Sequence, residues 1–283
     1  MEIKEFEAKS ILTPCKLPDA DYVVNPYTGC AFGCTYCYTS FMGRYVGKSN
    51  SDWGNYVYVK ANAPQLLLKD LGKLKNKGRD KCIFFSSVTD PYQGLEAKYE
   101  LTKECMEKLL EFGFRGKLSI LTKSQLVLRD LDILKQFENV EVGLTITTTQ
   151  DAISRYFEKK APNVSQRLDT LKKLNGNGIK TYAFVGPLLP HFVTEEHNLD
   201  ELFKTIAATG TKELYIEHIN LSAYIKERLL KEMPELQKDI IDKFYNSQHK
   251  EYRQELDKLI KKLVNKYKLK LKLDSTLYHK EIS

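Results

Sequence analysis

The fold and the chemistry of this chain depend on one stretch, Asn25-Pro26-Tyr27-Thr28-Gly29-Cys30-Ala31-Phe32-Gly33-Cys34-Thr35-Tyr36-Cys37-Tyr38. Its three cysteines stand at a C-x3-C-x2-C spacing, and Gly29 and Gly33 allow tight turns of the backbone on either side of Cys30. A loop of this kind can direct three thiolates at one centre. Three thiolates leave one iron of a 4Fe–4S cluster without a protein ligand. A small molecule bound at that iron can accept an electron directly from the cluster.

Zinc binding and disulfide formation are the two other uses that such cysteines have. A structural zinc site usually has four protein ligands, often as two C-x2-C pairs. Cys15, Cys82 and Cys105 are scattered singly, and no nearby histidine completes a second pair. A disulfide framework is disfavoured by the chain length and by the lack of a secretory signal, so the cysteines read as cytosolic thiols. A non-catalytic iron–sulfur or zinc protein remains an alternative.

The composition fits one sizeable core: the chain has 283 residues, of which 42% are hydrophobic and 29% charged. No apolar run approaches the ~20 residues needed to span a bilayer. The first residues are mixed and acidic, unlike a signal peptide. We therefore expect a cytoplasmic protein with no membrane segment. The formal net charge is +7, of which +5 lies in residues 222–283.

Six short apolar or β-branched runs predict strands, at 22–25, 81–87, 117–122, 140–147, 179–185 and 213–219. Runs with helical spacing separate them, at about 64–78, 102–112, 126–134, 165–175 and 199–208. Repeated βα units imply a parallel sheet, and the short apolar strands imply burial on both faces. For residues 1–221 we expect an incomplete (β/α)6 barrel, with residues 1–21 as an arm before the first strand.

Polar residues stand where these strands end, which is where such sheets carry their chemistry. They are the cysteine loop, Ser86-Ser87-Val88-Thr89-Asp90, Thr122-Lys123-Ser124, Thr145-Ile146-Thr147-Thr148, Gly186-Pro187 and Glu217-His218-Ile219-Asn220. Hydroxyls, a cation, acids and an amide suit a zwitterionic amino acid, a ribose and an adenine. The alternative is that the hydroxyls only cap the helices that follow.

Several motifs together resemble the spore photoproduct lyase-like branch of the radical S-adenosylmethionine (radical SAM) enzymes. They are Lys9-Ser10-Ile11-Leu12, Asn25-Pro26-Tyr27 with the cysteine loop, Thr89-Asp90-Pro91-Tyr92-Gln93 with Glu96, Thr122-Lys123-Ser124, Arg129-Asp130, Ala161-Pro162 and Arg167-Leu168. The resemblance covers roughly residues 8–190. It implies that Cys30, Cys34 and Cys37 ligate a 4Fe–4S cluster whose fourth iron is chelated by SAM.

The resemblance also implies these contacts to SAM: Tyr36 with the adenine; Ser86, Ser87, Thr89 and Asp90 with the amino group; Lys123 with the carboxylate; and Thr145 and Thr147 with the ribose. Glu158 and Arg167 are interpreted as a structural ion pair rather than a catalytic one.

One departure from the named lyase bears on the reaction. That enzyme has a cysteine hydrogen donor just before its Ser/Thr-Asp step, where this chain has Ser86-Ser87-Val88. Cys82 lies earlier, within the strand. The sequence therefore names no catalytic hydrogen donor, and we do not expect repair of spore photoproduct.

Residues 222–283 are expected to form a separate, helical and basic C-terminal extension. Helical spacing runs over about 224–244, broken at Pro234, and over about 250–267. Residues 258–272 carry seven lysines and no acid. The alternating run 268–273 suits an edge strand whose lysines discourage aggregation. Contact of these lysines with phosphates is the other interpretation.

The sequence thus predicts a radical SAM enzyme, in which a reduced cluster cleaves SAM to a 5′-deoxyadenosyl radical that abstracts hydrogen from a substrate. A low-potential donor such as flavodoxin or ferredoxin is implied. Nucleic acid is the favoured substrate, and a peptide or a small metabolite is the alternative.

Overall fold

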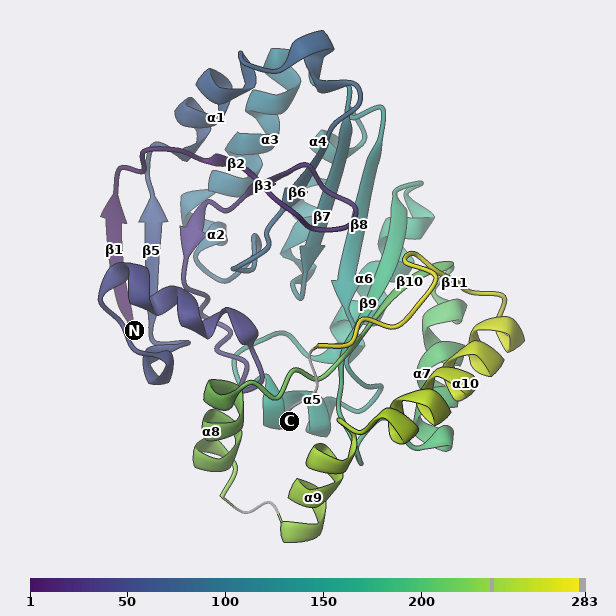
Figure 1. The fold of residues 1–283 in the computed structure, drawn as a ribbon. Helices are drawn as coiled ribbons and strands as arrows, with labels where there is room; N and C mark the ends of the chain where they lie inside the picture. Colours follow the sequence, from purple (N-terminus) through teal and green to yellow (C-terminus); the bar gives the residue numbers. More distant parts are fainter. Residues whose placement is uncertain (235–236, 280–283) are drawn as a thin grey trace. The chain divides into compact units, whose positions relative to one another are not determined.

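The computed structural model describes residues 1–234 and 237–279 (Figure 1). By its internal contacts the chain divides into two compact units. The first unit comprises residues 1–33, 39–143 and 173–180, and the second unit comprises residues 34–38, 144–172 and 181–283. Among the described residues, no helix is both long enough and apolar enough to cross a bilayer.

The main sheet of the first unit is largely parallel. Its strands follow the order β8-β7-β6-β3-β2, in which β8 comprises Val140–Thr145. Strands β3 (Tyr22–Val24), β6 (Cys82–Phe85) and β7 (Lys117–Thr122) pair in parallel, and β2 (Leu12–Pro14) joins β3 antiparallel at the edge. Ile83, Leu118 and Ile120 have no exposed surface, so the central apolar side chains of β6 and β7 lie in the core.

Helices of the first unit lie beside this sheet. Helices α1 (Ala63–Leu71) and α3 (Leu101–Phe112) pack against each other (Figure 1). The short helices α2 (Glu96–Tyr99) and α4 (Leu131–Leu134) complete the set. Gly113, with a φ of +75°, ends α3 where the sequence predicted an end.

A second, small sheet forms in the first unit from residues that are far apart in the sequence. Strand β5 (Tyr56–Lys60) pairs in parallel with β1 (Glu2–Phe6) and antiparallel with β4 (Tyr27–Thr28). The prediction of residues 1–21 as an arm is therefore wrong, because that segment supplies β1 and β2. The mixed, exposed sequence of β1 gives no strand signal of its own, since its hydrogen-bonding partner lies some fifty residues away.

The strands of the second unit follow the order β11-β10-β9-β8. Strand β10 (Glu213–His218) pairs in parallel with β9 (Lys180–Leu188) and with β11 (Lys270–Leu271). Strand β8 (Val140–Thr145) and helix α6 (Val164–Gly176) each contribute residues to both units. Within neither unit do the described strands close into a barrel.

The remaining helices belong to the second unit: α5 (Asp151–Phe157), α7 (Glu196–Ala208), α8 (Ala223–Glu232), α9 (Lys238–Asn246) and α10 (Lys250–Lys266). Helices α7 and α10 pack against each other (Figure 1). Two tail helices on either side of Pro234, followed by a third, are as the sequence predicted. Within residues 268–273, only Lys270 and Leu271 form the predicted edge strand.

The α/β fold with a parallel sheet is confirmed, and strands occur at all six predicted places. Two helices differ from the prediction. The helix expected over 64–78 ends at Leu71, because Gly72 weakens the helix and residues Asn76 and Lys77 take positive φ angles. The run 126–134 begins as a 3-10 helix, Gln125–Asp130, before the single turn of α4. The division at residue 221 stays a prediction.

Candidate functional site

The start of the cysteine loop is held by close backbone contacts that only glycine permits. Gly29 has a φ of +91°, and a Cβ there would lie 2.5 Å from the carbonyl oxygen of Tyr56. Gly33 has a φ of +59°, and a Cβ there would lie 2.9 Å from the Cα of Gly54. Both contacts join the loop to the segment around β5, within the first unit. The two glycines therefore fix the path of the chain on either side of Cys30.

The cysteines of the loop provide suitable chemistry for an iron–sulfur cluster. All six cysteines of the chain are thiols, and Cys30 and Cys34 are buried while Cys37 is partly exposed. The backbone N–H of Cys37 donates to the carbonyl of Cys34 at 3.1 Å, which makes a turn between the two. Among residues 1–234 and 237–279, no three His, Cys, Asp or Glu side chains already converge as a metal site. Three thiols on one short loop nonetheless match the ligand type that such clusters require.

Tyr36, between two of these cysteines, joins a buried polar network in the second unit. Its hydroxyl donates to the Glu158 carboxylate, which also forms an ion pair with Arg167. The predicted ion pair is thus present, and both of its side chains are fully buried. Burial, followed by the charge of Glu158, raises the pKa of Tyr36 well above its usual value. Burial lowers the pKa of Arg167, but the Glu158 carboxylate outweighs it and the net shift is upward.

The two threonines at the end of β8 belong to the same network. The Arg167 guanidinium donates to the carbonyl oxygen of Thr145 at 3.2 Å. The hydroxyl of Thr147 donates to Glu158 at 3.5 Å, and that of Ser154 does so at 2.9 Å. Both threonines are buried. The structure therefore brings together Tyr36, Thr145 and Thr147, three of the residues that the sequence singled out.

In the first unit, Asn25 organises the polar end of β6. Its side-chain oxygen accepts hydrogen bonds from the backbone N–H groups of Ser87 at 3.0 Å and Val88 at 3.1 Å. Its side-chain nitrogen donates to the Ser87 hydroxyl at 3.3 Å. The neighbouring Ser86 hydroxyl donates to the carbonyl of Val24 at 3.1 Å. This role for Asn25 was not predicted, although the Asn-Pro-Tyr motif was the signal that could have suggested it.

The next residues tie the same segment to the cysteine loop. The hydroxyl of Thr89 donates to the carbonyl of Gly29 at 2.6 Å. The side chain of Gln93 donates to that carbonyl at 3.3 Å and accepts from the backbone N–H of Ala31 at 2.7 Å. Gln93 is fully buried. The Thr89–Gln93 segment therefore holds the loop on both sides of Cys30.

Asp90 accepts three hydrogen bonds from within the protein. The donors are the Thr122 hydroxyl at 2.6 Å and the backbone N–H groups of Lys123 at 2.8 Å and Tyr92 at 2.9 Å. Burial raises the pKa of Asp90, and these hydrogen bonds oppose the rise. The carboxylate thus fixes the main chain at Lys123, whose side chain is half-buried.

Glu96 connects the segment before the cysteine loop to helix α3 and to Arg129. Its carboxylate accepts from the Tyr27 hydroxyl, from Arg129 at 3.0 Å and from the backbone N–H of Thr102 at 3.0 Å. Tyr27 stands just before the cysteine loop, and Thr102 lies in the first turn of α3. The motif residues Asp90, Gln93 and Glu96 therefore act on the protein's own chain.

Helix α8 supplies two contacts to the cysteine loop that the sequence did not reveal. Arg228 donates to the carbonyl of Cys34 at 3.3 Å, and the Tyr224 hydroxyl donates to the carbonyl of Tyr38 at 2.8 Å. The sequence identified the helix by its apolar spacing. Nothing in that spacing indicates that a polar residue of the helix contacts the loop.

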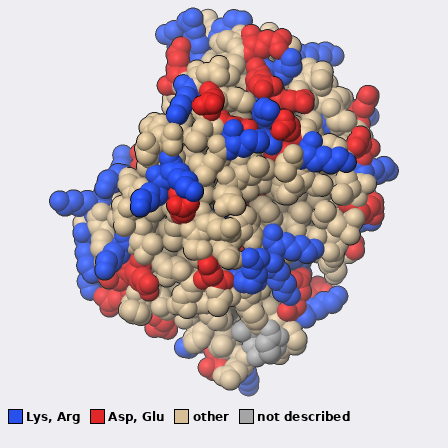
Figure 2. All heavy atoms as spheres, turned by 180° about the vertical axis from the view of Figure 1, so that it is seen from behind, with Lys and Arg blue, Asp and Glu red and all other residues tan. Residues whose placement is uncertain are grey.

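The basic tail is largely neutralised within the chain. Four of its seven lysines form ion pairs: Lys258 with Glu255, Lys262 with Glu196, Lys266 with Asp200 and Lys272 with Glu213. On the face shown in Figure 2, basic and acidic residues are interspersed. Contact of this tail with phosphates stays a prediction, and it has fewer available cations than the sequence suggested.

Comparisons with known proteins identify the family of this chain. The radical SAM superfamily model matches residues 24–206. A protein of Methanocaldococcus jannaschii, named only as uncharacterised, is 39% identical over 223 residues, which are 79% of this chain and 80% of that protein. The spore photoproduct lyase of Clostridium acetobutylicum is 24% identical over 78% of this chain, which spans 62% of that enzyme.

The fold also has solved relatives. A structure of spore photoproduct lyase complexed with dinucleoside spore photoproduct superimposes with a TM-score of 0.72 at 17% identity, over 95% of this chain and 81% of that one. The superfamily match includes the whole cysteine loop and more than half of the chain. This chain is therefore an enzyme of radical chemistry and belongs to the radical SAM superfamily.

Proposed function

We propose that this protein cleaves SAM reductively and uses the product radical to abstract a hydrogen atom from a substrate. Cys30, Cys34 and Cys37 would hold the 4Fe–4S cluster. When bound, the cluster supplies the electron that splits SAM into methionine and a 5′-deoxyadenosyl radical. The observation that carries the proposal is the three-cysteine loop inside the region that matches the superfamily.

The hydroxyls at the end of β6 are suited to the amino group of SAM. Ser86 and Thr89 donate their hydrogens to main-chain carbonyls, so their oxygen lone pairs can accept from an ammonium group. Ser87 is held beside them by Asn25. Asp90 accepts three internal hydrogen bonds, which supports a role in orienting this segment, with its charge adding to the attraction for the ammonium group.

The remaining contacts are proposed on the basis of the chemistry of each group. Lys123 would form a charge-assisted pair with the SAM carboxylate. Its main chain is fixed by the hydrogen bond from its backbone N–H to Asp90. Tyr36 would lie against the adenine, since its hydroxyl bond to Glu158 restricts the ring. Thr145 and Thr147 would meet the ribose.

The substrate class proposed is nucleic acid. The support is the similarity in sequence to a spore photoproduct lyase and in fold to that enzyme complexed with a dinucleoside photoproduct. A peptide or a small metabolite is the alternative, and the internal ion pairs of the basic tail weaken the case for phosphate binding there. Flavodoxin or ferredoxin is the proposed electron donor, and a cytoplasmic setting stays a prediction.

The decisive experiment measures 5′-deoxyadenosine. The protein is reconstituted with iron and sulfide without oxygen, reduced with dithionite and mixed with SAM. We expect 5′-deoxyadenosine from the wild type and none from the variant with all three loop cysteines replaced by Ala. A reduced protein that carries a full cluster but makes no 5′-deoxyadenosine would contradict the proposal and favour a binding or sensing role.

A further inference from the structure

Helix α8 holds the cysteine loop at two main-chain carbonyls. Arg228 Nη2 lies 3.3 Å from the carbonyl oxygen of Cys34, and the Tyr224 hydroxyl lies 2.8 Å from that of Tyr38. These two carbonyls stand on either side of Cys37. All of these residues belong to the second unit. A segment some 190 residues later in the sequence thus sets the path of the loop between two proposed cluster ligands.

Arg228 brings a buried positive charge to this place. The residue is 3% exposed. Its Nε pairs with Glu232 at 3.1 Å, but Glu232 is 29% exposed and therefore partly screened by water. Its Nη1 is buried and has no hydrogen-bond partner in the part of the chain that the structure describes. Burying a cation with incomplete pairing is costly, so a gain elsewhere must offset that cost.

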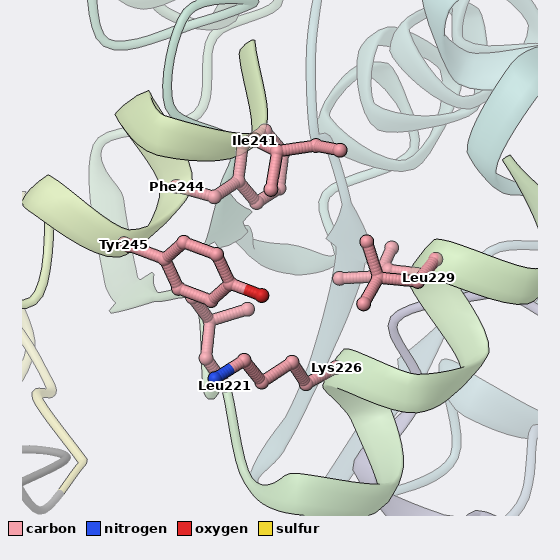
Figure 3. A pocket seen from close by; sticks show the side chains of 7 residues that line it. Leu221, Lys226, Leu229, Ile241, Phe244 and Tyr245 are labelled. Atoms are coloured by element: carbon pink, nitrogen blue, oxygen red, sulfur yellow. The ribbon is translucent and has the colours of Figure 1, made fainter. Parts of the chain in front are cut away.

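Helix α8 is itself held on another side by α9. Leu229 of α8 faces a small apolar pocket that Phe244 and Tyr245 of α9 also line (Figure 3). The Lys226 amine lies 4.3 Å from the centroid of the Tyr245 ring. These contacts hold α8 against α9. The position of the Arg228 guanidinium beside the loop is therefore restricted by the packing of its helix.

We propose that Arg228 is a positioning residue for the cluster, which fixes the main chain of Cys34 and makes reduction of the cluster easier. The proposal rests on the proposed function, since it assumes a cluster at these cysteines. Reduction adds one electron from the reductant; no bond forms or breaks and no proton moves. The site gains one negative charge, and a nearby buried cation stabilises that charge. The midpoint potential of the cluster is therefore raised by Arg228.

The test compares Arg228→Met with Lys231→Met, which removes an exposed cation from the same helix. Both variants and the wild type are reconstituted, their iron content is measured, and the midpoint potential is determined by dithionite titration followed by electron paramagnetic resonance. We expect a more negative potential in Arg228→Met and an unchanged one in Lys231→Met. Arg228→Lys, which keeps the charge, should stay close to the wild type.

A second measurement uses the cluster-free protein. Hydrogen exchange of the backbone amides in residues 34–38 should be faster in Arg228→Met and in Tyr224→Phe than in the wild type and Lys231→Met. Tyr224→Phe removes one hydrogen bond but no charge, so its cluster potential should not change.

The outcomes separate the two proposals. A wild type that takes up no iron defeats the proposed function, and with it the effect of Arg228 on reduction. A wild type with a full cluster and an Arg228→Met potential equal to that of Lys231→Met defeats the inference alone. If Arg228→Met does not fold, Tyr224→Phe decides whether α8 fixes the main chain of the loop. A wild-type exchange rate in residues 34–38 of that variant contradicts this part of the inference, and a faster rate supports it.

Discussion

The side chain of Asn25 holds Ser87 at two points, although 62 residues separate them in the sequence. Its oxygen accepts from the Ser87 backbone N–H at 3.0 Å, and its nitrogen donates to the Ser87 hydroxyl at 3.3 Å. Asn25 also opens the stretch that leads into the cysteine loop. The side chain at position 87 therefore has a defined place relative to that stretch.

This relationship makes the missing hydrogen donor testable. We expect the wild type not to repair spore photoproduct, because that reaction must return a hydrogen atom to a thymine radical and an alcohol O–H bond is too strong to donate it efficiently. Ser87→Cys keeps both backbone N–H bonds to Asn25 and introduces a thiol. The assay supplies the dinucleotide photoproduct, SAM and reductant.

Gain of repair only in Ser87→Cys would support this view and would show that the site accepts a nucleic acid. Clean repair by the wild type would refute it, and Tyr92 would then be the first alternative donor to examine. Ser86→Cys is a matched control, since the Ser86 hydroxyl is buried against the carbonyl of Val24.

The three loop cysteines should all be cluster ligands, and the other three should not. We expect Cys30→Ala, Cys34→Ala and Cys37→Ala each to lower the iron content of the reconstituted protein below a full 4Fe–4S cluster. Cys15→Ala, Cys82→Ala and Cys105→Ala serve as controls and should keep it. Iron and sulfide analysis with absorption spectra decides the matter, and a full cluster in Cys34→Ala would exclude that ligand.

Lys123 should contribute to SAM binding and not to cluster binding. Lys123→Ala is expected to weaken SAM binding by about 1.5–3 kcal/mol, the usual range for a hydrogen bond to a charged group. The exposed Lys69→Ala on α1 is the control and should leave the affinity unchanged. Calorimetry of the reconstituted proteins measures the SAM affinity of both variants. An affinity of Lys123→Ala equal to that of Lys69→Ala would show that the Lys123 side chain faces solvent and does not contact SAM.

The buried pair of Glu158 and Arg167 should matter for folding as well as for Tyr36. Arg167→Met leaves a buried carboxylate without its cation, so we expect a loss of about 3–5 kcal/mol in the free energy of unfolding. The double variant Glu158→Gln/Arg167→Met should lose less, because no uncompensated charge remains. Urea denaturation of the cluster-free proteins tests this.

Glu255→Gln, which breaks the exposed pair with Lys258, should change the unfolding free energy by no more than about 1 kcal/mol. An Arg167→Met protein as stable as this control would show that the buried pair contributes nothing.

His218 should make the protein less stable in mild acid. Burial, followed by the charge of Arg253, lowers its pKa to about 4 from 6.5. Between these pH values His218 is protonated in the unfolded chain and neutral in the folded chain. The unfolding free energy therefore falls as the pH drops from 6.5 towards 4. The full effect is about 3 kcal/mol. His218→Phe should flatten this slope in urea denaturation between those pH values, and an unchanged slope would assign it to other groups.

The sequence predicted those parts of the fold whose signals are local. Strands β6 and β7 have buried apolar side chains, among them Ile83, Leu118 and Ile120, and Gly113 marks the end of α3. Strand β1 could not be predicted, because its residues are exposed and its pairing depends on β5. The alternating run 268–273 did indicate an edge strand, but the residues that pair, Lys270 and Leu271, are decided by β10.

The site was predictable to a similar extent. The spacing of the cysteines and the position of Gly29 and Gly33 beside them are local signals, whereas the direction in which a carboxylate faces is not. Asp90 was expected to face a ligand, and its three internal donors show that it also holds the chain at Lys123. Arg228 could not be found at all, because only the fold brings α8 to Cys34.

The polar atoms of Asp90, Gln93 and Glu96 bind the protein's own chain, which separates the stability of the scaffold from the choice of substrate. These side chains bind the cysteine loop, the main chain at Lys123 and the start of α3, and those contacts do not depend on what the enzyme acts upon. Substitutions elsewhere can therefore change what the enzyme acts upon while these contacts stay as they are. The segment therefore reports on how the scaffold is held together and not on which substrate the enzyme uses.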